Sequence, residues 1–157
     1  MKDNITFARL SEVEPSVLVA HMSDPRVTAH MPLLTAEWGL ETIATFLDQK
    51  EQCWTRDGLG HWAILSLGQY VGWGGFQKEG EEWDFGLVLT RDAFGLGRRI
   101  AKKAIDFAVA DPRIPFVTFL LPPSRKNLGA LARLGAEPIG EIDYGGTTFL
   151  KFRLATV

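Results

Sequence analysis

Two glycines and two arginines stand together at the start of an amphipathic stretch, in the order Gly95-Leu96-Gly97-Arg98-Arg99. Glycines carry no side chain, so a ligand can approach the backbone closely. If a helix begins here, its first N–H groups have no intrahelical partner, and the helix dipole adds partial positive charge. Arg98 and Arg99 add full positive charge where the dipole alone would disfavour it. These residue types predict a site for a phosphate or pyrophosphate.

The glycine loop matches none of the complete nucleotide-binding motifs. No Gly-Lys-Ser/Thr sequence follows the glycines, so the loop is not a Walker A loop, and no Mg²⁺-holding motif accompanies it. Position 100 is Ile, where a dinucleotide-binding fingerprint needs its third glycine. A plain junction between a loop and a helix remains the alternative interpretation.

The elements on either side of the loop are expected to position it. Phe85 and Leu87–Leu89 form a short apolar run that is typical of a buried strand. After the glycines, apolar residues recur at helical spacing and charged residues take the other face. A second apolar run, Phe116–Leu121, suits a strand that is buried on both faces. Because a helix joins these two runs, we expect the two strands to be parallel.

The remaining chain alternates between strand and helix patterns. Further strands are expected at Ile5–Leu10, His61–Leu67, Tyr70–Gln77, Ile139–Tyr144 and Thr147–Leu154. Further helices are expected at Glu12–His21, Ala36–Gln52 and Ser124–Leu134, with turns at Ser23–Pro25 and Lys78–Glu82 and an irregular segment over 27–35. The order predicts a single α/β (α+β) domain over residues 1–157, with one mixed central sheet of about seven strands and about four flanking helices.

Composition restricts the class of protein. The net charge of −2 argues against a broad nucleic-acid or acidic-membrane surface, and no apolar run approaches the length of a membrane span. The single cysteine, Cys53, excludes an internal disulfide framework and fits a reducing compartment. The cysteine and the histidines lack the spacing of metal ligands. We therefore expect a cytoplasmic protein with no metal, no nucleic-acid partner and no membrane partner.

Two segments, AFGLGRRIAKKAIDFA and PPSRKNLGALARLGA, resemble the GNAT superfamily of acetyl-CoA-dependent N-acetyltransferases, and so does the order of elements. The resemblance spans nearly the whole chain and implies the fold of that family. The family loop Q/R-x-x-G-x-G/A, whose amides hold the pyrophosphate of acetyl-CoA, can be laid on residues 92–97 or on residues 94–99. Asp92 stands where the first register expects Gln or Arg. The resemblance thus implies acetyl-CoA contacts at Phe94, Gly95, Leu96, Gly97, Arg98 and Arg99.

The second segment implies further contacts with acetyl-CoA. Leu134-Gly135-Ala136 matches the Leu-Gly-Phe that ends the last helix of the family. Counting back places Ser124 at the Asn of the family and Asn127 one turn later. In the branch that acetylates ribosomal-protein N-termini, this later position often carries a small polar cofactor contact. The alternative is that Ser124 only caps the helix.

The resemblance also implies how acetyl transfer is divided among residues. A carboxylate on a central strand usually takes the proton of the amine, which here means Asp84 or Glu82. His61 is an alternative base because its unperturbed pKa lies near working pH. The tyrosine that serves as general acid falls on Leu131, so Tyr144 would have to substitute. A backbone N–H at the end of the strand before the loop usually meets the thioester carbonyl, and the candidates are Leu87, Val88 and Leu89.

The acceptor side is implied by the early segment MSDPRVTAHMPLLTAEWGLETIATFL, which resembles the same ribosomal-protein branch. There, the region between the first two helices lines the acceptor site. The candidates for substrate binding are His30, Met31, Glu37, Trp38 and His61. Packing is the alternative for Trp38, as a staple of the following helix, and first-turn charge is the alternative for Glu37.

The resemblance implies acetyl transfer from acetyl-CoA to the primary amine of a small molecule or a protein N-terminus, by direct attack in a ternary complex. A non-catalytic module that binds CoA or a partner is the alternative, because Asp92 and Leu131 depart from the family pattern. By the same resemblance, the strand-rich C-terminal hairpin is a candidate surface for a homodimer.

Overall fold

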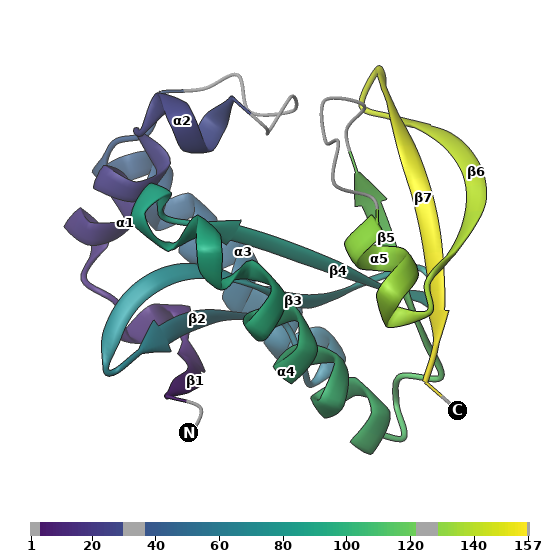
Figure 1. Cartoon of the computed structure of the whole chain (residues 1–157). Coiled ribbons are helices and arrows are strands. Elements are labelled where there is room, and N and C mark those ends of the chain that lie inside the picture. The colour runs from purple at the N-terminus through teal and green to yellow at the C-terminus, as the bar shows by residue number, and fades with distance from the viewer. Residues whose placement is uncertain (1–3, 30–36, 122–128, 157) are drawn as a thin grey trace.

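The computed structural model describes residues 4–29, 37–121 and 129–156, without the side chains of 129–131 and 144. Its centre is one mixed sheet of seven strands in the order β1-β2-β3-β4-β5-β7-β6 (Figure 1). The strands are β1 (Ile5–Arg9), β2 (His61–Ser66), β3 (Gln69–Glu79), β4 (Glu82–Leu89), β5 (Phe116–Leu121), β6 (Glu137–Tyr144) and β7 (Thr147–Ala155). Every neighbouring pair is antiparallel except β4 and β5, which are parallel as expected. The fold class and the number of strands are therefore confirmed.

The described residues form five α helices and two 3-10 helices. The α helices are α1 (Pro15–Met22), α2 (Pro25–Thr28), α3 (Leu40–Asp57), α4 (Gly97–Ala110) and α5 (Gly129–Leu134). The 3-10 helices are η1 (Leu10–Glu12) and η2 (Arg91–Leu96). The helix after β4 and the short helix that ends before Gly135 are both confirmed.

Two expectations about the first helical region are wrong. Pro25 opens α2 where the sequence favoured a turn, because the Asp24 side chain caps the helix by accepting from the Arg26 N–H at 3.0 Å. Helix α3 begins at Leu40 rather than at Ala36, with Gly39 as its N-cap. Proline at the first helical position and glycine at a cap are compatible with both a helix end and a turn, so the local sequence did not distinguish them.

The sequence predicted the turn between β6 and β7 correctly, but it predicted too long a turn between β3 and β4. Gly145 and Gly146 join β6 and β7 with φ of 61° and 82°, the left-handed region that a two-residue hairpin turn requires. In the other hairpin, the pairing of β3 with β4 extends to Glu79 and Glu82. The expected polar turn at Lys78–Glu82 is therefore shorter than the sequence indicated.

Helices cover both faces of the sheet, with α4 crossing in front of β2–β4 and α3 behind them in Figure 1. On the α4 face, Trp62, Phe76 and Val117 pack with Ala104 and Ala108 of the helix. On the opposite face, Ala63 and Trp73 form a cluster with residues of α1 and α3, namely Leu18, Met22 and Ile43. Because successive strand residues face opposite sides, neighbouring residues such as Trp62 and Ala63 belong to different cores.

Candidate active site

The parallel strands β4 and β5 pair over a short stretch and then separate. Trp83, Asp84 and Phe85 pair with residues 117–119, and the described pairing between the two strands ends there. Beyond Phe85, β4 continues beside β3 alone, and β5 continues beside β7 (Figure 1). On the side facing β5, residues 86–89 thus have no strand partner within the described chain. Backbone polar groups need partners, so this separation offers them to a ligand.

Asp84 lies at the point where the two strands separate. Its Oδ1 accepts a hydrogen bond of 3.2 Å from the hydroxyl of Thr118, its cross-strand neighbour on β5. Burial raises the pKa of Asp84 to about 7, and the negative charges of Glu79 and Glu82 add to that shift. The Thr118 hydrogen bond and the positive charge of Lys151 oppose it. A carboxylate with this pKa can accept a proton near neutral pH and release it again.

Glu82, the alternative carboxylate of the sequence analysis, has a different environment. The ammonium of Lys151 on β7 lies 2.7 Å from its Oε1. The pair is partly buried rather than fully solvated, since 18% of the Lys151 side chain and 36% of the Glu82 side chain are exposed. The ion pair with Lys151 occupies one carboxylate oxygen of Glu82, which favours Asp84 over Glu82 as a proton acceptor.

His61 lies on the same face of the sheet as Asp84, in a polar cluster that also contains Lys50 and Gln77. The Lys50 Nζ is 3.0 Å from His61 Nδ1 and 2.9 Å from Gln77 Oε1. Burial holds the pKa of His61 well below its usual value, and the positive charge of Lys50 lowers it further. Burial also lowers the pKa of Lys50 to about 8. A histidine with so low a pKa is a poor acceptor of protons, which counts against His61 as the general base.

The sequence did not identify Lys50, Gln77 and Thr118 as members of this cluster. Lys50 lies on an amphipathic helix where a charged residue normally faces water, so its type gave no signal. Gln77 was detectable in principle, because alternation along β3 places it on the same face as Trp73. Thr118 was hidden in an apolar run, since a threonine suits a strand as well as valine does.

The glycine loop continues the chain directly from β4, but it is helical rather than an open turn. Residues 91–96 form η2, and α4 begins at Gly97 without a side-chain cap at Leu96. A side chain added at Gly95 would meet no atom within 4 Å, so the space beside it is open. Arg98 and Arg99 are exposed in the first turn of α4, and Phe94 is 48% exposed.

The residues at the end of β4 divide between the site and the core. Leu89 is buried and packs with Ala93 and Ile100, which attaches the first turn of α4 to the strand. Leu87 and Val88 are half-buried beyond the last pair with β5. The strand, the loop and the helix N-terminus that the sequence singled out are thus brought to one end of the separation between β4 and β5. The open space beside Gly95 and the exposed Arg98 and Arg99 fit a bound pyrophosphate.

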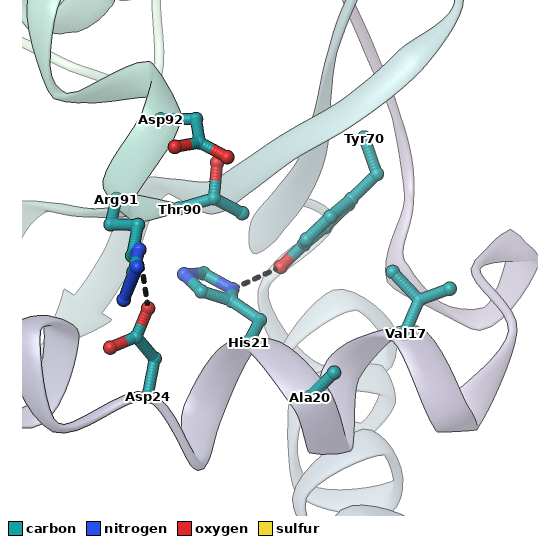
Figure 2. Close-up of a pocket in the computed structure, with 8 residues that line it drawn as sticks. All are labelled: Val17, Ala20, His21, Asp24, Tyr70, Thr90, Arg91 and Asp92. Carbon is teal, nitrogen blue, oxygen red and sulfur yellow. Dashed lines mark hydrogen bonds and ion pairs between the residues drawn. The ribbon is translucent and has the colours of Figure 1, made fainter.

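A pocket of about 380 Å³ opens between α1 and the chain that follows β4 (Figure 2). His21 Nδ1 and the Tyr70 hydroxyl are 2.7 Å apart in its wall, and Arg91 pairs with Asp24 at 3.7 Å. Burial lowers the pKa of His21 and raises that of Tyr70. The sequence did not predict this pocket, because its lining comes from segments far apart in the chain.

The remaining candidates for acceptor binding are only partly described. Trp38 is half-buried and packs edge-on against Phe46 of α3, with ring centroids 5.5 Å apart, as the packing alternative proposed. Glu37 is exposed and precedes α3, so it does not complement the first turn, where Glu41 stands instead. The residues whose positions or side chains lie outside the described part of the chain are His30, Met31, Ser124, Asn127, Leu131 and Tyr144.

The described residues contain neither a candidate metal site nor a membrane-spanning helix. No group of three or more His, Cys, Asp or Glu side chains in this part of the chain is placed to hold a metal ion. No helix within it is both long and apolar enough to cross a membrane.

Comparison with known proteins places these features in a family context. The family model for the acetyltransferase (GNAT) domain matches residues 4–137. Comparison with curated proteins gives no match. An acetyltransferase of the GNAT family from Bacillus anthracis superposes with a TM-score of 0.77 at 15% identity, covering 99% of this chain and 98% of that one.

Two further solved structures of similar shape hold coenzyme A. Spermidine N-acetyltransferase from Vibrio cholerae, solved with CoA and spermine, superposes with a TM-score of 0.77 at 7% identity, covering 98% of this chain and 96% of that one. An aminoglycoside acetyltransferase solved with coenzyme A gives a TM-score of 0.75 at 12% identity, covering 96% and 94%. At these identities the likeness establishes a common fold.

Proposed function

The chain belongs to the GNAT acetyltransferase family, and on that premise we propose that it transfers the acetyl group of acetyl-CoA to a primary amine, by direct attack in a ternary complex. The observation that carries the proposal is the position of Asp84. This carboxyl has a pKa raised to about 7 and lies where β4 and β5 separate. An amine can attack only after it loses a proton, and a base with a pKa near working pH suits that task.

The residues that would hold acetyl-CoA lie along β4 and the loop that follows it. Gly95 of η2 and the first turn of α4, with Gly97, Arg98 and Arg99, suit the pyrophosphate, and Phe94 and Leu96 flank Gly95. When bound, acetyl-CoA supplies the acetyl group as a reactive thioester. A backbone N–H among Leu87, Val88 and Leu89 would donate to the oxygen on which negative charge develops.

Asp84 would take the proton of the amine, directly or through a water molecule. Thr118 donates to one oxygen of its carboxylate, which holds the group in place. Tyr144 is proposed as the acid that protonates the leaving thiolate, and Ser124 and Asn127 as further cofactor contacts, all from the resemblance. His30, Met31, Glu37 and Trp38 are the acceptor-side residues on the same basis.

The acceptor that we favour is a small-molecule amine. The spermidine and aminoglycoside acetyltransferases of similar fold are named for acceptors of this class. A protein N-terminus is the second candidate acceptor, because the early segment resembles the branch that acetylates ribosomal proteins.

The experiment that tests the proposal combines binding with turnover. Acetyl-CoA at about 100 times its dissociation constant should stabilise the folded protein by roughly 2.7 kcal/mol, and NAD and ATP should not. Release of free CoA thiol should then depend on an added primary amine from a panel of polyamines, aminoglycosides and short peptides. A specific shift without amine-dependent thiol release would favour the alternative, a CoA-binding module without catalysis. No specific shift at all would contradict the acetyl-CoA site.

A further inference from the structure

The His61 ring reaches across the sheet from β2 to β4. His61 pairs with Gly75 of β3, and Gly75 pairs with Gly86 of β4, so the three residues form one row. The two glycines leave the row free of other side chains on the face that His61 occupies. A methyl group added at Gly86 would lie 3.7 Å from both Nε2 and Cε1 of the imidazole. The far edge of the ring therefore lies over the backbone of β4.

A chain of hydrogen bonds determines which nitrogen of His61 carries the proton. It begins at Glu79, whose carboxylate can only accept, and Gln77 Nε2 donates to that carboxylate at 3.2 Å. The amide oxygen of Gln77 is thereby turned toward Lys50, which donates to it. Lys50 also donates to His61 Nδ1. A nitrogen that accepts a hydrogen bond is bare, so the proton of the neutral ring is on Nε2.

The surroundings of Lys50 favour a protonated ammonium in this series of hydrogen bonds. Its Nζ lies 4.9 Å from the centre of the Trp73 ring and 5.4 Å from that of Phe46. Aromatic faces attract cations, and the amide oxygen of Gln77, its other hydrogen-bond partner, can only accept. A neutral amine could instead accept from His61 and reverse the tautomer. The neighbours of Lys50 disfavour that arrangement.

The Nε2–H group has no partner within the described part of the chain, although the histidine is only 7% exposed. Buried donors are nearly always satisfied, and an exception in a native fold calls for an explanation. Gly86 is the first residue of β4 beyond the last pair with β5, and Asp84 lies on the same face of the sheet. The unpartnered donor is thus directed at the place where the two strands separate.

We propose that His61 Nε2–H is a hydrogen-bond donor for a ligand oxygen in this site, and that Lys50 is the positioning residue that fixes the donor tautomer. The inference rests on the proposed function. The oxygen belongs either to the acceptor molecule, as a hydroxyl or carbonyl near its amine, or to the thioester carbonyl of acetyl-CoA. In both cases His61 donates a hydrogen bond and does not act as a base.

The tautomer is tested without any ligand, by the nitrogen-15 shifts of the His61 ring in the whole protein. We expect a bare Nδ1 and a protonated Nε2 at neutral pH, and loss of this preference in Lys50→Met. A proton on Nδ1, or a doubly protonated ring, would overturn the inference whether or not the protein has activity.

The ligand oxygen is tested by rates of thiol release with two matched pairs of amines: ethanolamine against n-propylamine, and glycinamide against isobutylamine. The rates are compared at equal concentrations of the unprotonated amine. His61→Leu removes the donor, while His61→Gln places an amide near the position of Nε2. If the acceptor supplies the oxygen, His61→Leu lowers the rate for the oxygen-bearing amines about tenfold and leaves their matched analogues unchanged. If the thioester supplies it, all four rates fall together while the affinity for acetyl-CoA holds.

In either case His61→Gln should restore much of the loss. The inference would be contradicted if His61→Leu had the same rates as the unmodified protein and the same preference for the oxygen-bearing amines over their analogues. If the unmodified protein acetylates no amine, the proposed function fails, and the assignment of a ligand oxygen fails with it. The tautomer is then decided separately by the nitrogen shifts.

Gly86→Ala gives an independent test that leaves His61 in place. Its methyl group would lie at ordinary contact distance from the ring, and Gly86 is not in the left-handed region. The variant should therefore fold, with an unchanged thermal midpoint, while the methyl covers Nε2–H. We expect rates to fall as in His61→Leu. Full activity in a folded Gly86→Ala would contradict a ligand at this donor.

Discussion

Asp84 combines a carboxyl group, partial burial and a hydroxyl partner at the point where β4 and β5 separate. Burial is the largest cause of its raised pKa, and the charges of Glu79 and Glu82 add to it. Burial lowers the pKa of Lys50 and of His61, because it disfavours the charged form of any group, and the charged form of these two is the protonated one. Burial therefore gives a carboxyl that titrates near neutrality and, on the same face of the sheet, a histidine that stays neutral.

The activity of Asp84→Asn should differ from that of the unmodified protein in both size and pH dependence. In the unmodified protein, kcat/KM should rise with pH until about 7 and then level off, because only the ionised carboxyl accepts a proton. Asp84→Asn should lose about 100-fold in rate and this pH step as well. Thiol release from pH 5.5 to 9 measures both. Glu82→Gln is the control, and an equal loss there would show that Asp84 is not the base.

Although Asp84→Asn should lose activity, its stability relative to the unmodified protein should rise with pH. The folded pKa of Asp84 lies above its ordinary value of 3.8, so the folded state binds the proton more tightly than the unfolded state. Ionisation therefore destabilises the fold progressively as pH rises from about 4 to about 7. Asp84→Asn cannot ionise, so its stability relative to the unmodified protein should increase over that range. Urea unfolding at pH 5 and pH 8 measures the difference, and a constant difference would contradict the raised pKa.

The functional element is the continuous run of β4, η2 and α4. Leu89 of the strand packs with Ala93 of η2 and Ile100 of α4, so these three segments share one small core. This core fixes the first turn of α4 relative to the end of the strand. The geometry between a pyrophosphate site and a thioester site on β4 thus depends on apolar contacts rather than on the loop alone.

Gly95→Glu should abolish the binding of acetyl-CoA while preserving the fold. A side chain at Gly95 meets open space, so the protein accommodates it, but its charge would repel a pyrophosphate and its bulk would fill the approach. Val109→Glu is the matched control, because it adds the same charge at an exposed position, 58% accessible, near the other end of α4. Calorimetric titration with acetyl-CoA measures the effect. Equal affinity in the two variants would contradict the site.

At the scale of the whole molecule, the sheet has an apolar core on its α4 face and the polar cluster on its other face. Phe76 of β3 lies in the core on the α4 face and contacts the rings of Trp62, Phe85 and Phe107. It is fully buried, and its partners come from β2, β4 and α4. Strands β2, β3 and β4 carry His61, Gln77 and Asp84 on their other face. Packing on the α4 face therefore determines the spacing of these polar residues.

Phe76→Ala should destabilise the whole domain by about 3–5 kcal/mol, since it removes a fully buried ring and leaves a cavity between the sheet and α4. Urea unfolding followed by both tryptophan fluorescence and circular dichroism measures the loss. The two signals should shift together, because small single domains unfold cooperatively. Val109→Ala, at an exposed position on the same helix, should cost less than about 1 kcal/mol. Comparable losses in the two variants would show that Phe76 is not central to the core.

The sequence by itself determined the elements whose signals are local. The apolar run of β4, the glycines and the 3.6-residue spacing of α4 predicted a strand, a loop and a helix in that order, and Gly145-Gly146 predicted the last hairpin. The strand count followed from the same patterns. The presence of Asp84 on a central strand near the loop was also readable. The start of α3 and the existence of α2 were not, because proline and glycine near a helix end favour turns equally.

Only the tertiary structure determined which polar groups meet. Lys50, His61, Gln77, Asp84 and Thr118 come from α3 and four different strands, and residues far apart in the chain form their hydrogen bonds. Strand register places Gln77 beside Asp84, and Asp84 beside Thr118; a shift of one residue would turn each side chain to the other face. Burial, which sets the pKa of each group, likewise depends on what packs around it. Periodicity reports only which face of its own element a residue occupies, so the sequence indicated the candidates but not the cluster that they form.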